Sequence, residues 1–233
     1  MRRDAAAIGS AVALAIACSG PTGPSPTAAS CNPTAGTSRL ATPFFIKPFA
    51  GDFPTGNMFD HDKPFVFEDT NGYLLTMCGD RDARQVDGHP GYDWRMAEGT
   101  PLFAVADGLV MYAGLEGPFH CPPLGRTVQA VYVQLRHRGP DGIEYLSIYG
   151  HLSRVGVAQG DTVPAGTTLG WSGNTGCSGT PHLHFGVFKG REGSFTQVDP
   201  YGWHVSMPDP WEADPRGAAS VWLWKDGEAP RIR

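Results

Sequence analysis

The chain has 233 residues, including 31 glycines and 21 prolines, and its formal net charge is −5. This length suffices for one domain of moderate size with extensions, and the glycine and proline content favours turns over helices. Because the charge is negative and no basic tract is present, nucleic-acid binding has no electrostatic support.

The amino terminus has the pattern of an export signal. Arg2 and Arg3 precede a mainly apolar run, residues 5–17, which is too short to span a bilayer comfortably. Ala15-Ile16-Ala17 has the small-x-small pattern of a cleavage site, and Cys18 follows it directly. We therefore expect residues 1–17 to be a signal peptide.

The sequence before Cys18 resembles a bacterial lipobox, in which the cysteine is lipidated after cleavage. Ala15 stands where leucine is usual, so an ordinary secreted or periplasmic protein is the alternative. We expect an exported protein of the cell envelope whose only membrane contact is a lipid on Cys18. Residues 18–41 are rich in Pro, Gly, Ser and Thr and are expected to form an extended tether.

Short runs of β-branched and aromatic residues, separated by Gly, Pro or Asp, predict strands along the rest of the chain. The expected strands are 102–110, 128–135, 144–149 and 185–189, with two more at 64–67 and 220–225. Trp222 and Trp224 in the last of these are expected to pack on the core, and a place in a substrate groove is the alternative. Helical periodicity is nearly absent after residue 17, so we predict an all-β protein. The expected core is a compact antiparallel β-sandwich or partly open barrel with few or no helices.

Three histidine-bearing segments carry the chemistry. They supply four imidazoles and a carboxylate: His89, Asp93, His151, His182 and His184. Neutral imidazole and carboxylate bind Zn²⁺ while leaving a coordination position open for water, so the set predicts a hydrolytic metal site. The remaining histidines are expected to be ordinary surface or core residues: His61, His120, His137 and His204.

Local geometry can bring His89 close to Asp93 and His182 close to His184. Pro90-Gly91 between His89 and Asp93 opposes a helix, and an extended strand would separate the two by ~13 Å. A type II turn over Pro90-Gly91 brings its ends within ~7 Å instead. His182 and His184 differ by two positions, so on a strand both point to one face, roughly 6–7 Å apart. One can then hold the metal while the other faces the substrate.

Taken together, the motifs resemble the lysostaphin-type zinc metallopeptidases, murein endopeptidases with the all-β duplicated-hybrid-motif fold. The matching stretches are GHPGYDW at 88–94, GTPLFAVADG at 99–108, YGHL at 149–152, GNTG at 173–176 and PHLHF at 181–185. The usual glycine-proline before H-L-H appears here as Gly179-Thr180-Pro181. The resemblance implies a peptidase domain at 81–203. An amino-terminal extension, 42–80, would pack on that core, and 204–233 would form a carboxy-terminal extension.

The resemblance also implies the residue roles. His89, Asp93 and His184 would bind Zn²⁺, and His151 and His182 would be catalytic. The protein would then be a zinc metalloendopeptidase that hydrolyses peptide bonds in peptidoglycan cross-links or stem peptides, using a zinc-activated water with histidine acid–base assistance. The sequence does not specify which histidine is the base, which bond is cleaved or the oligomeric state.

Two other classes of function are compatible with parts of the sequence. A non-catalytic scaffold or regulator of cell-wall hydrolases would share the fold, but such relatives typically lose metal ligands, and here all are present. Residues 160–170 resemble half of a biotinyl or lipoyl carrier domain. That domain needs an exposed lysine on a tight hairpin, and the following residues, 171–176, contain none.

Four cysteines remain after Cys18, an even number in an exported chain, and they allow three pairings: Cys31, Cys78, Cys121 and Cys177. The family fold places Cys121 and Cys177 in loops at the rim of the cleft, so the resemblance favours a disulfide between them. Cys31 and Cys78 would then fasten the amino-terminal extension to the domain. Cys177 as a zinc ligand is the rival interpretation, which the complete ligand set opposes.

Overall fold

The structure is a computed structural model that describes residues 42–65, 71–191 and 193–232. Within these ranges the regular structure is antiparallel β-sheet, with one 3₁₀ turn, η1 (Pro122–Leu124), and one short helix, α1 (Pro210–Ala213). The prediction of an all-β protein with few helices is confirmed. No helix in the described ranges is long and apolar enough to cross a membrane. The expected signal peptide, tether and lipidated cysteine lie outside them.

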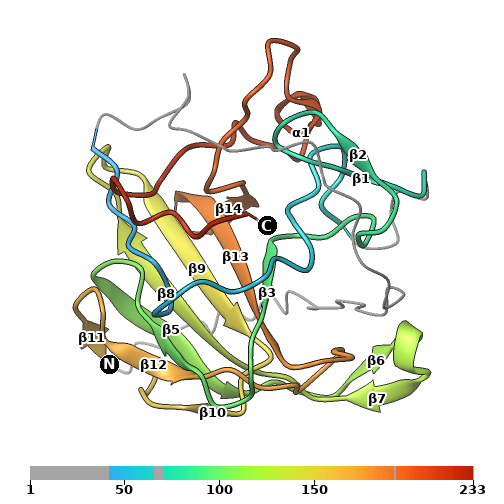
Figure 1. The fold of residues 1–233 in the computed structure, drawn as a ribbon. Coiled ribbons are helices and arrows are strands. Elements are labelled where there is room, and N and C mark those ends of the chain that lie inside the picture. The colour runs from blue at the N-terminus through green and yellow to red at the C-terminus, as the bar shows by residue number, and fades with distance from the viewer. Residues whose placement is uncertain (1–41, 66–70, 192, 233) are drawn as a thin grey trace, which may run out of the picture.

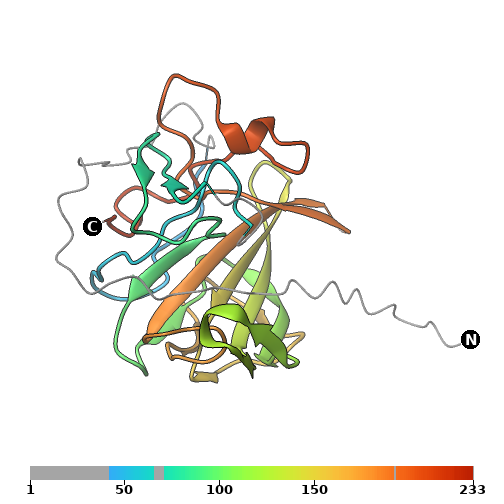
Figure 2. The ribbon, with the colours of Figure 1, turned by 90° about the vertical axis from the view of Figure 1, so that its right-hand side faces the viewer.

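A seven-stranded sheet forms the centre of the molecule, with the strand order β11-β5-β8-β9-β13-β14 and with β3 also paired to β13 (Figure 1). Its strands are β3 (Tyr92–Arg95), β5 (Gly108–Leu115), β8 (Val131–Arg138), β9 (Glu144–Gly150), β11 (Thr162–Val163), β13 (His182–Arg191) and β14 (Ser194–Gln197). Figure 2 shows the long orange β13 running alongside the yellow strands. Successive side chains of a strand point to opposite faces, and β8 accordingly buries Val133, Leu135 and His137 in alternation.

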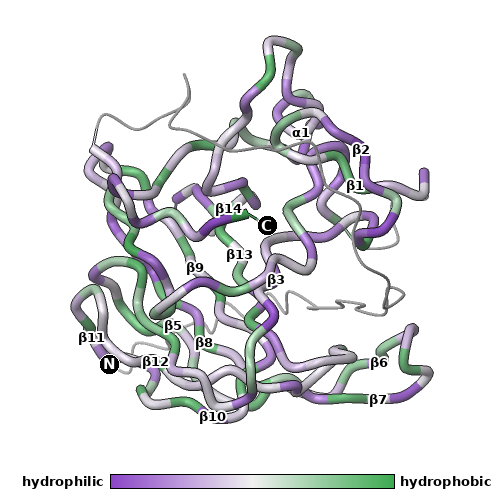
Figure 3. Tube along the Cα trace, viewed as in Figure 1, coloured by the Kyte–Doolittle hydropathy of each residue, from purple (hydrophilic) through white to green (hydrophobic). Residues whose placement is uncertain are grey.

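Smaller sheets surround this centre. One has three strands, β10 (Arg154–Val155), β12 (Thr168–Trp171) and β4 (Pro101–Phe103). Two others are hairpins, β1 (Leu74–Leu75) with β2 (Arg81–Asp82), and β6 (Phe119–Cys121) with β7 (Arg126–Val128). The β6–β7 hairpin projects beyond the end of the central sheet in Figure 1. Figure 3 shows that hydrophobic and hydrophilic stretches alternate along the chain throughout these elements.

The strand predictions are partly correct. Strands β9 and β13 contain the predicted 144–149 and 185–189. The expected single strand at 102–110 is wrong, because the chain leaves the ladder between β4 and β5. There the amide of Val105 donates to the Tyr149 hydroxyl at 2.9 Å, and its carbonyl accepts from Ile46 at 2.7 Å. Likewise 128–135 is divided between β7 and β8.

The two strands expected in the extensions do not form as predicted. Residues 220–225 make only isolated bridges, because Trp222 pairs with Tyr201 and Trp224 with the distant Phe45. Both tryptophan side chains are nevertheless buried in the core, as expected. For the segment 64–67, residues 64 and 65 are not in a strand, and the other two lie outside the described residues.

A buried ionic cluster joins three distant segments. His61 lies between two carboxylates, with Nε2 2.9 Å from Asp199 Oδ2 and Nδ1 3.0 Å from Asp209 Oδ1. Burial alone would lower the pKa of His61, but the hydrogen bonds to Asp199 and Asp209 outweigh it and raise the pKa to about 9. Tyr92 of β3 donates to the same Asp199 oxygen at 2.7 Å. The cluster therefore fastens the segment before β1 and the segment around α1 to the central sheet.

Candidate active site

Strand register brings the metal-binding motif together. In β13, His184 is in register with Asp93 of β3 on one side and with Gly150 of β9 on the other. His182 lies two residues earlier, so alternation along the strand points both imidazoles to one face, as predicted. His151 directly follows Gly150 at the end of β9. The sheet thus gathers residues from three separate motifs at one place.

The route from His89 to Asp93 differs from the prediction. The expected type II turn over Pro90-Gly91 is wrong, because Gly91 does not have the positive φ that this turn needs at its third position. The turn lies earlier, at Gly88 (φ 75°), and the amide of His89 closes it on the Val86 carbonyl at 3.2 Å. Gly91 serves a close approach instead, since a Cβ there would lie 2.4 Å from the Phe185 carbonyl oxygen of β13.

Asp93 is the centre of the site. One ligand atom each from His89, Asp93 and His184 lies within 4.8 Å of the others, and all three residues are buried. Asp93 Oδ1 is 2.9 Å from His184 Nδ1 and 3.2 Å from His89 Nε2. His182 Nε2 also lies 3.5 Å from this oxygen. The predicted ligands and one predicted catalytic histidine therefore converge on one carboxylate.

Groups outside the motifs orient the ligands. Met58 accepts a hydrogen bond from His89 Nδ1 at 2.9 Å through its backbone carbonyl, which leaves Nε2 with its lone pair toward Asp93. The Asn57 amide donates to Asp93 Oδ2 at 2.7 Å, and its own oxygen accepts from the amide of Val86 at 3.0 Å. Sequence reasoning missed both residues, because they lie in the segment before the motifs and carry no pattern of their own.

The other two histidines are held in one tautomer each. His151 Nδ1 donates to the Thr175 carbonyl at 2.7 Å, and His182 Nδ1 donates to the Thr180 carbonyl at 2.7 Å. Each Nε2 is buried and finds no hydrogen-bond partner among the described residues. The two rings face each other at 4.6 Å between centroids. His151 has φ 63°, a left-handed conformation rare outside glycine, which turns the chain back toward the site.

Electrostatics match a cation site. Burial would raise the pKa of Asp93, but its proximity to His89 and His182 outweighs burial and holds the pKa well below the usual range. Burial lowers the pKa of His184 to about 4 and that of His151 to about 3. Burial would lower the pKa of His89, but its attraction and hydrogen bond to Asp93, together with hydrogen bonds to the backbone, outweigh burial and raise the pKa.

The donor set fits a divalent metal ion. One ionised carboxylate and two imidazoles are ligand types of an open metal site. The orphaned Nε2 of His89, fully buried, supports this fit. Among the remaining histidines, His61 and His137 are buried and hydrogen-bonded at both ring nitrogens, whereas His120 is exposed.

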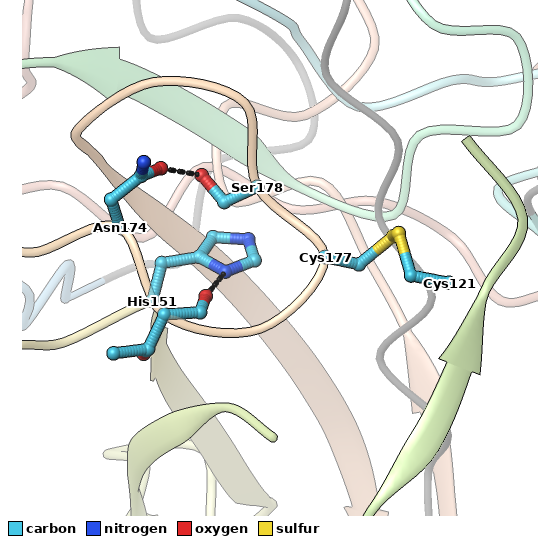
Figure 4. The surroundings of a disulfide bond; sticks show 6 residues. Cys121, His151, Asn174, Cys177 and Ser178 are labelled. Carbon is cyan, nitrogen blue, oxygen red and sulfur yellow. Dashed lines mark hydrogen bonds between the residues drawn. A yellow bond between two sulfur atoms is a disulfide. The ribbon is translucent and has the colours of Figure 1, made fainter. Parts of the chain in front are cut away.

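A disulfide lies near His151 (Figure 4). Cys121 of β6 and Cys177 are bonded with their Cα atoms 5.4 Å apart, so the predicted pairing is confirmed. The rival interpretation of Cys177 as a metal ligand is wrong, because its sulfur is engaged in this bond. Cys78 is also disulfide-bonded, and its predicted partner Cys31 lies outside the described residues.

Comparison with known proteins points to a peptidase family. The sequence pattern described as peptidase family M23 matches residues 87–200. A glycyl-glycine endopeptidase, ALE-1, of Staphylococcus capitis is 36% identical over 112 residues, which is 48% of this chain and 28% of that protein. A DD-carboxypeptidase/endopeptidase, Mpg, of Neisseria meningitidis serogroup B is 37% identical over 146 residues, 62% of this chain and 29% of that protein.

The chain thus spans less than a third of the length of either curated relative. Among solved structures, the catalytic domain of the antimicrobial peptidase lysostaphin from Staphylococcus simulans is 30% identical. That match covers 55% of this chain and 86% of the lysostaphin domain, with a TM-score of 0.36.

Proposed function

Through residues 87–200 the chain belongs to peptidase family M23, and from this premise we propose that it is a zinc metalloendopeptidase that cleaves peptide bonds of peptidoglycan. One observation carries the proposal: His89, Asp93 and His184 form a buried set with ligand atoms within 4.8 Å. Two more buried histidines border this set. The relatives above are named as peptide hydrolases, and the resemblance in the motifs points to peptidoglycan as the source of the peptide.

We assign zinc to His89, Asp93 and His184. When bound by two neutral imidazoles and one carboxylate, zinc lowers the pKa of a water molecule to ~7 and polarises a peptide carbonyl. Asn57 and the Met58 carbonyl prepare the ligands for this task, because they fix the orientation of Asp93 and the tautomer of His89.

His151 and His182 supply acid–base chemistry. Because each donates its Nδ1–H to a backbone carbonyl, each keeps a lone pair on Nε2. One imidazole accepts the proton of the attacking water and delivers it to the leaving amine. The other, once protonated on Nε2, donates a hydrogen bond to the oxygen on which negative charge develops. His182 Nε2 lies 3.5 Å from Asp93 Oδ1 and the His151 ring lies beside the His182 ring, so both border the ligand set and either can take either role.

Purified peptidoglycan tests the function. The zinc-loaded protein should release peptides or shorten cross-links, and mass spectrometry of the products identifies the bond. Parallel digests of glycine-bridged and directly cross-linked material separate the two kinds of substrate. A protein that binds zinc tightly yet leaves both materials intact would favour the alternative, a non-catalytic scaffold or regulator of cell-wall hydrolases.

We also place the protein in the cell envelope. The apolar run 5–17 and the Ala-x-Ala pattern before Cys18 support this location. Mass spectrometry of the mature protein from its native host should show an amino-terminal Cys18, carrying acyl chains in a lipoprotein and none in a secreted form. A mature species that retains Met1 would contradict export.

A further inference from the structure

One loop holds both of the proposed acid–base histidines. We call residues 174–180, between β12 and β13, the acceptor loop. Its Thr175 carbonyl accepts from His151 Nδ1 and its Thr180 carbonyl accepts from His182 Nδ1, each at 2.7 Å. The two bonds set the tautomer of both imidazoles. Any movement of this loop therefore alters the groups that handle protons.

A network of side-chain hydrogen bonds reinforces the bond between the Thr180 carbonyl and His182. The buried Ser178 hydroxyl lies 2.6 Å from Asn174 Oδ1 and donates to it (Figure 4). This leaves a lone pair of the hydroxyl oxygen for His182 Nδ1, which is 3.2 Å away. An imidazolium formed at His182 would keep both acceptors, the Thr180 carbonyl and the Ser178 hydroxyl. Ser178 and Asn174 are thus placed to position His182 and its charged form.

The two halves of the acceptor loop are anchored differently. Thr175 is fixed by its own side chain, which donates to the Leu152 carbonyl at 2.8 Å and accepts from the amide of Val131 at 3.0 Å. Residues 176–181 make no backbone–backbone hydrogen bond to the other parts of the chain that the structure describes. Besides the hydrogen bonds of Ser178 to Asn174 and of Ser178 and Thr180 to His182, these residues are tied to β6 covalently by the Cys121–Cys177 disulfide, in which both cysteines are buried. The covalent bond therefore matters most for the half that holds His182.

We propose that the Cys121–Cys177 disulfide is a positioning device for His182 that acts through Ser178, so that the rate of hydrolysis depends on the redox state of this bond. The proposal rests on the function assigned above. Opening the bond takes two electrons and two protons from a dithiol reductant, which is itself oxidised to a disulfide. The loop half around Ser178 then loses its anchor, while Thr175 and the metal ligands keep theirs.

Measurements of the hydrolysis rate of the zinc-loaded protein, with and without the Cys121–Cys177 bond, test the proposal. The Cys121→Ser/Cys177→Ser variant should lose at least ~10-fold in kcat, while its KM and zinc content stay unchanged. This loss is smaller than the ~10²–10⁴-fold expected when an acid–base group is removed altogether. Treatment of the wild type with dithiol, followed by its removal, should give the same loss, reversible on reoxidation. An unchanged kcat in both cases overturns the proposal.

Two controls isolate the bond. Cys78 is also disulfide-bonded, so the dithiol is applied to the double-serine variant too. If the untreated double-serine variant is as active as wild type and loses activity only with dithiol, the effect belongs to Cys78 and the proposal is refuted. Ser178→Ala retains the disulfide and tests the link to His182 directly, even if the double-serine variant does not fold. It should lower kcat with KM preserved, and Asn174→Asp, which keeps the acceptor oxygen, should lose less than Asn174→Leu. Equal kcat in Ser178→Ala and wild type contradicts the role of Ser178.

Ring tautomers provide a readout that needs no activity. In ¹⁵N NMR spectra of the oxidised, zinc-loaded protein, His151 and His182 should each show a single Nδ1–H form. Reduction should mix the tautomers of His182 and leave His151 nearly unchanged. Equal responses of the two rings would refute the anchoring argument. Failure to cleave any peptidoglycan, with these NMR changes present, would refute the proposed function and leave the positioning intact.

Discussion

The proposed function assigns metal binding to Asp93 with two histidines and proton transfer to two other histidines, and single substitutions can separate these tasks. His184→Ala and Asp93→Ala each remove one group from a three-residue ligand set, so zinc and peptide hydrolysis should be lost together. His151→Ala and His182→Ala should retain zinc but lose ~10²–10⁴-fold in rate. Metal content measured beside kcat distinguishes the classes, with the exposed His120→Ala as the control. A zinc-free His151→Ala beside a loaded, active His184→Ala would reverse the assignment.

Asn57 should tune metal affinity without being a ligand. Its amide donates to Asp93 Oδ2 at 2.7 Å, so Asn57→Ala removes one of the bonds that hold the carboxylate toward His89 and His184. Outer groups of this kind typically contribute 10–100-fold to metal affinity, and we expect a weakening of that order. Competition with a chelator measures it. Asn71→Ala, at an exposed asparagine, is the matched control; equal affinities of the two variants would contradict the prediction.

At the scale of elements, the pairing of β3 with β13 positions the site, and Gly91 permits it. A methyl group there would lie 2.4 Å from the Phe185 carbonyl oxygen, a backbone atom that cannot yield without separating the strands. Gly91→Ala should therefore cost at least about 2 kcal/mol of unfolding free energy, within the range of overpacked sites. Metal affinity should fall with it.

Gly117 provides the comparison. A Cβ at this position meets nothing within 4 Å, and its φ is not positive, so Gly117→Ala should stay within ~0.5 kcal/mol of wild type. Denaturant unfolding of both variants, with and without zinc, measures the difference. Similar stabilities would show that the strands accommodate the methyl group at Gly91.

Sequence patterns predicted the parts of the fold and site that depend on side-chain identity. The runs of β-branched and aromatic residues that became β9 and β13 are visible in the sequence, as is the spacing that puts His182 and His184 on one face. The break between β4 and β5 was not predictable, because it depends on the distant Tyr149 hydroxyl. The same holds for Thr175 and Thr180, which act through backbone carbonyls that any residue would supply.

At the scale of the whole molecule, the cluster around His61 should make stability depend on pH. The pKa of His61 is raised from 6.5 to about 9 in the folded protein. The stabilisation is therefore fully present below pH ~6.5 and is lost as the pH rises through ~9, by an amount on the order of 3 kcal/mol. His61→Gln cannot titrate, so its unfolding free energy should change less between pH 6.5 and 9.5. Identical slopes for variant and wild type in denaturant titrations would contradict this.

The same cluster also bears on how small a working enzyme can be made. The family match covers residues 87–200, which include Asp199 but not its partner His61, nor Asp209 beyond it. Asn57 and Met58, which orient two of the metal ligands, lie outside it as well. A fragment cut at the family boundaries would bury a carboxylate without its cation and leave the ligands unsupported. We therefore expect the smallest stable, metal-binding fragment to extend past both family boundaries, because segments on either side contact the core and the proposed ligands.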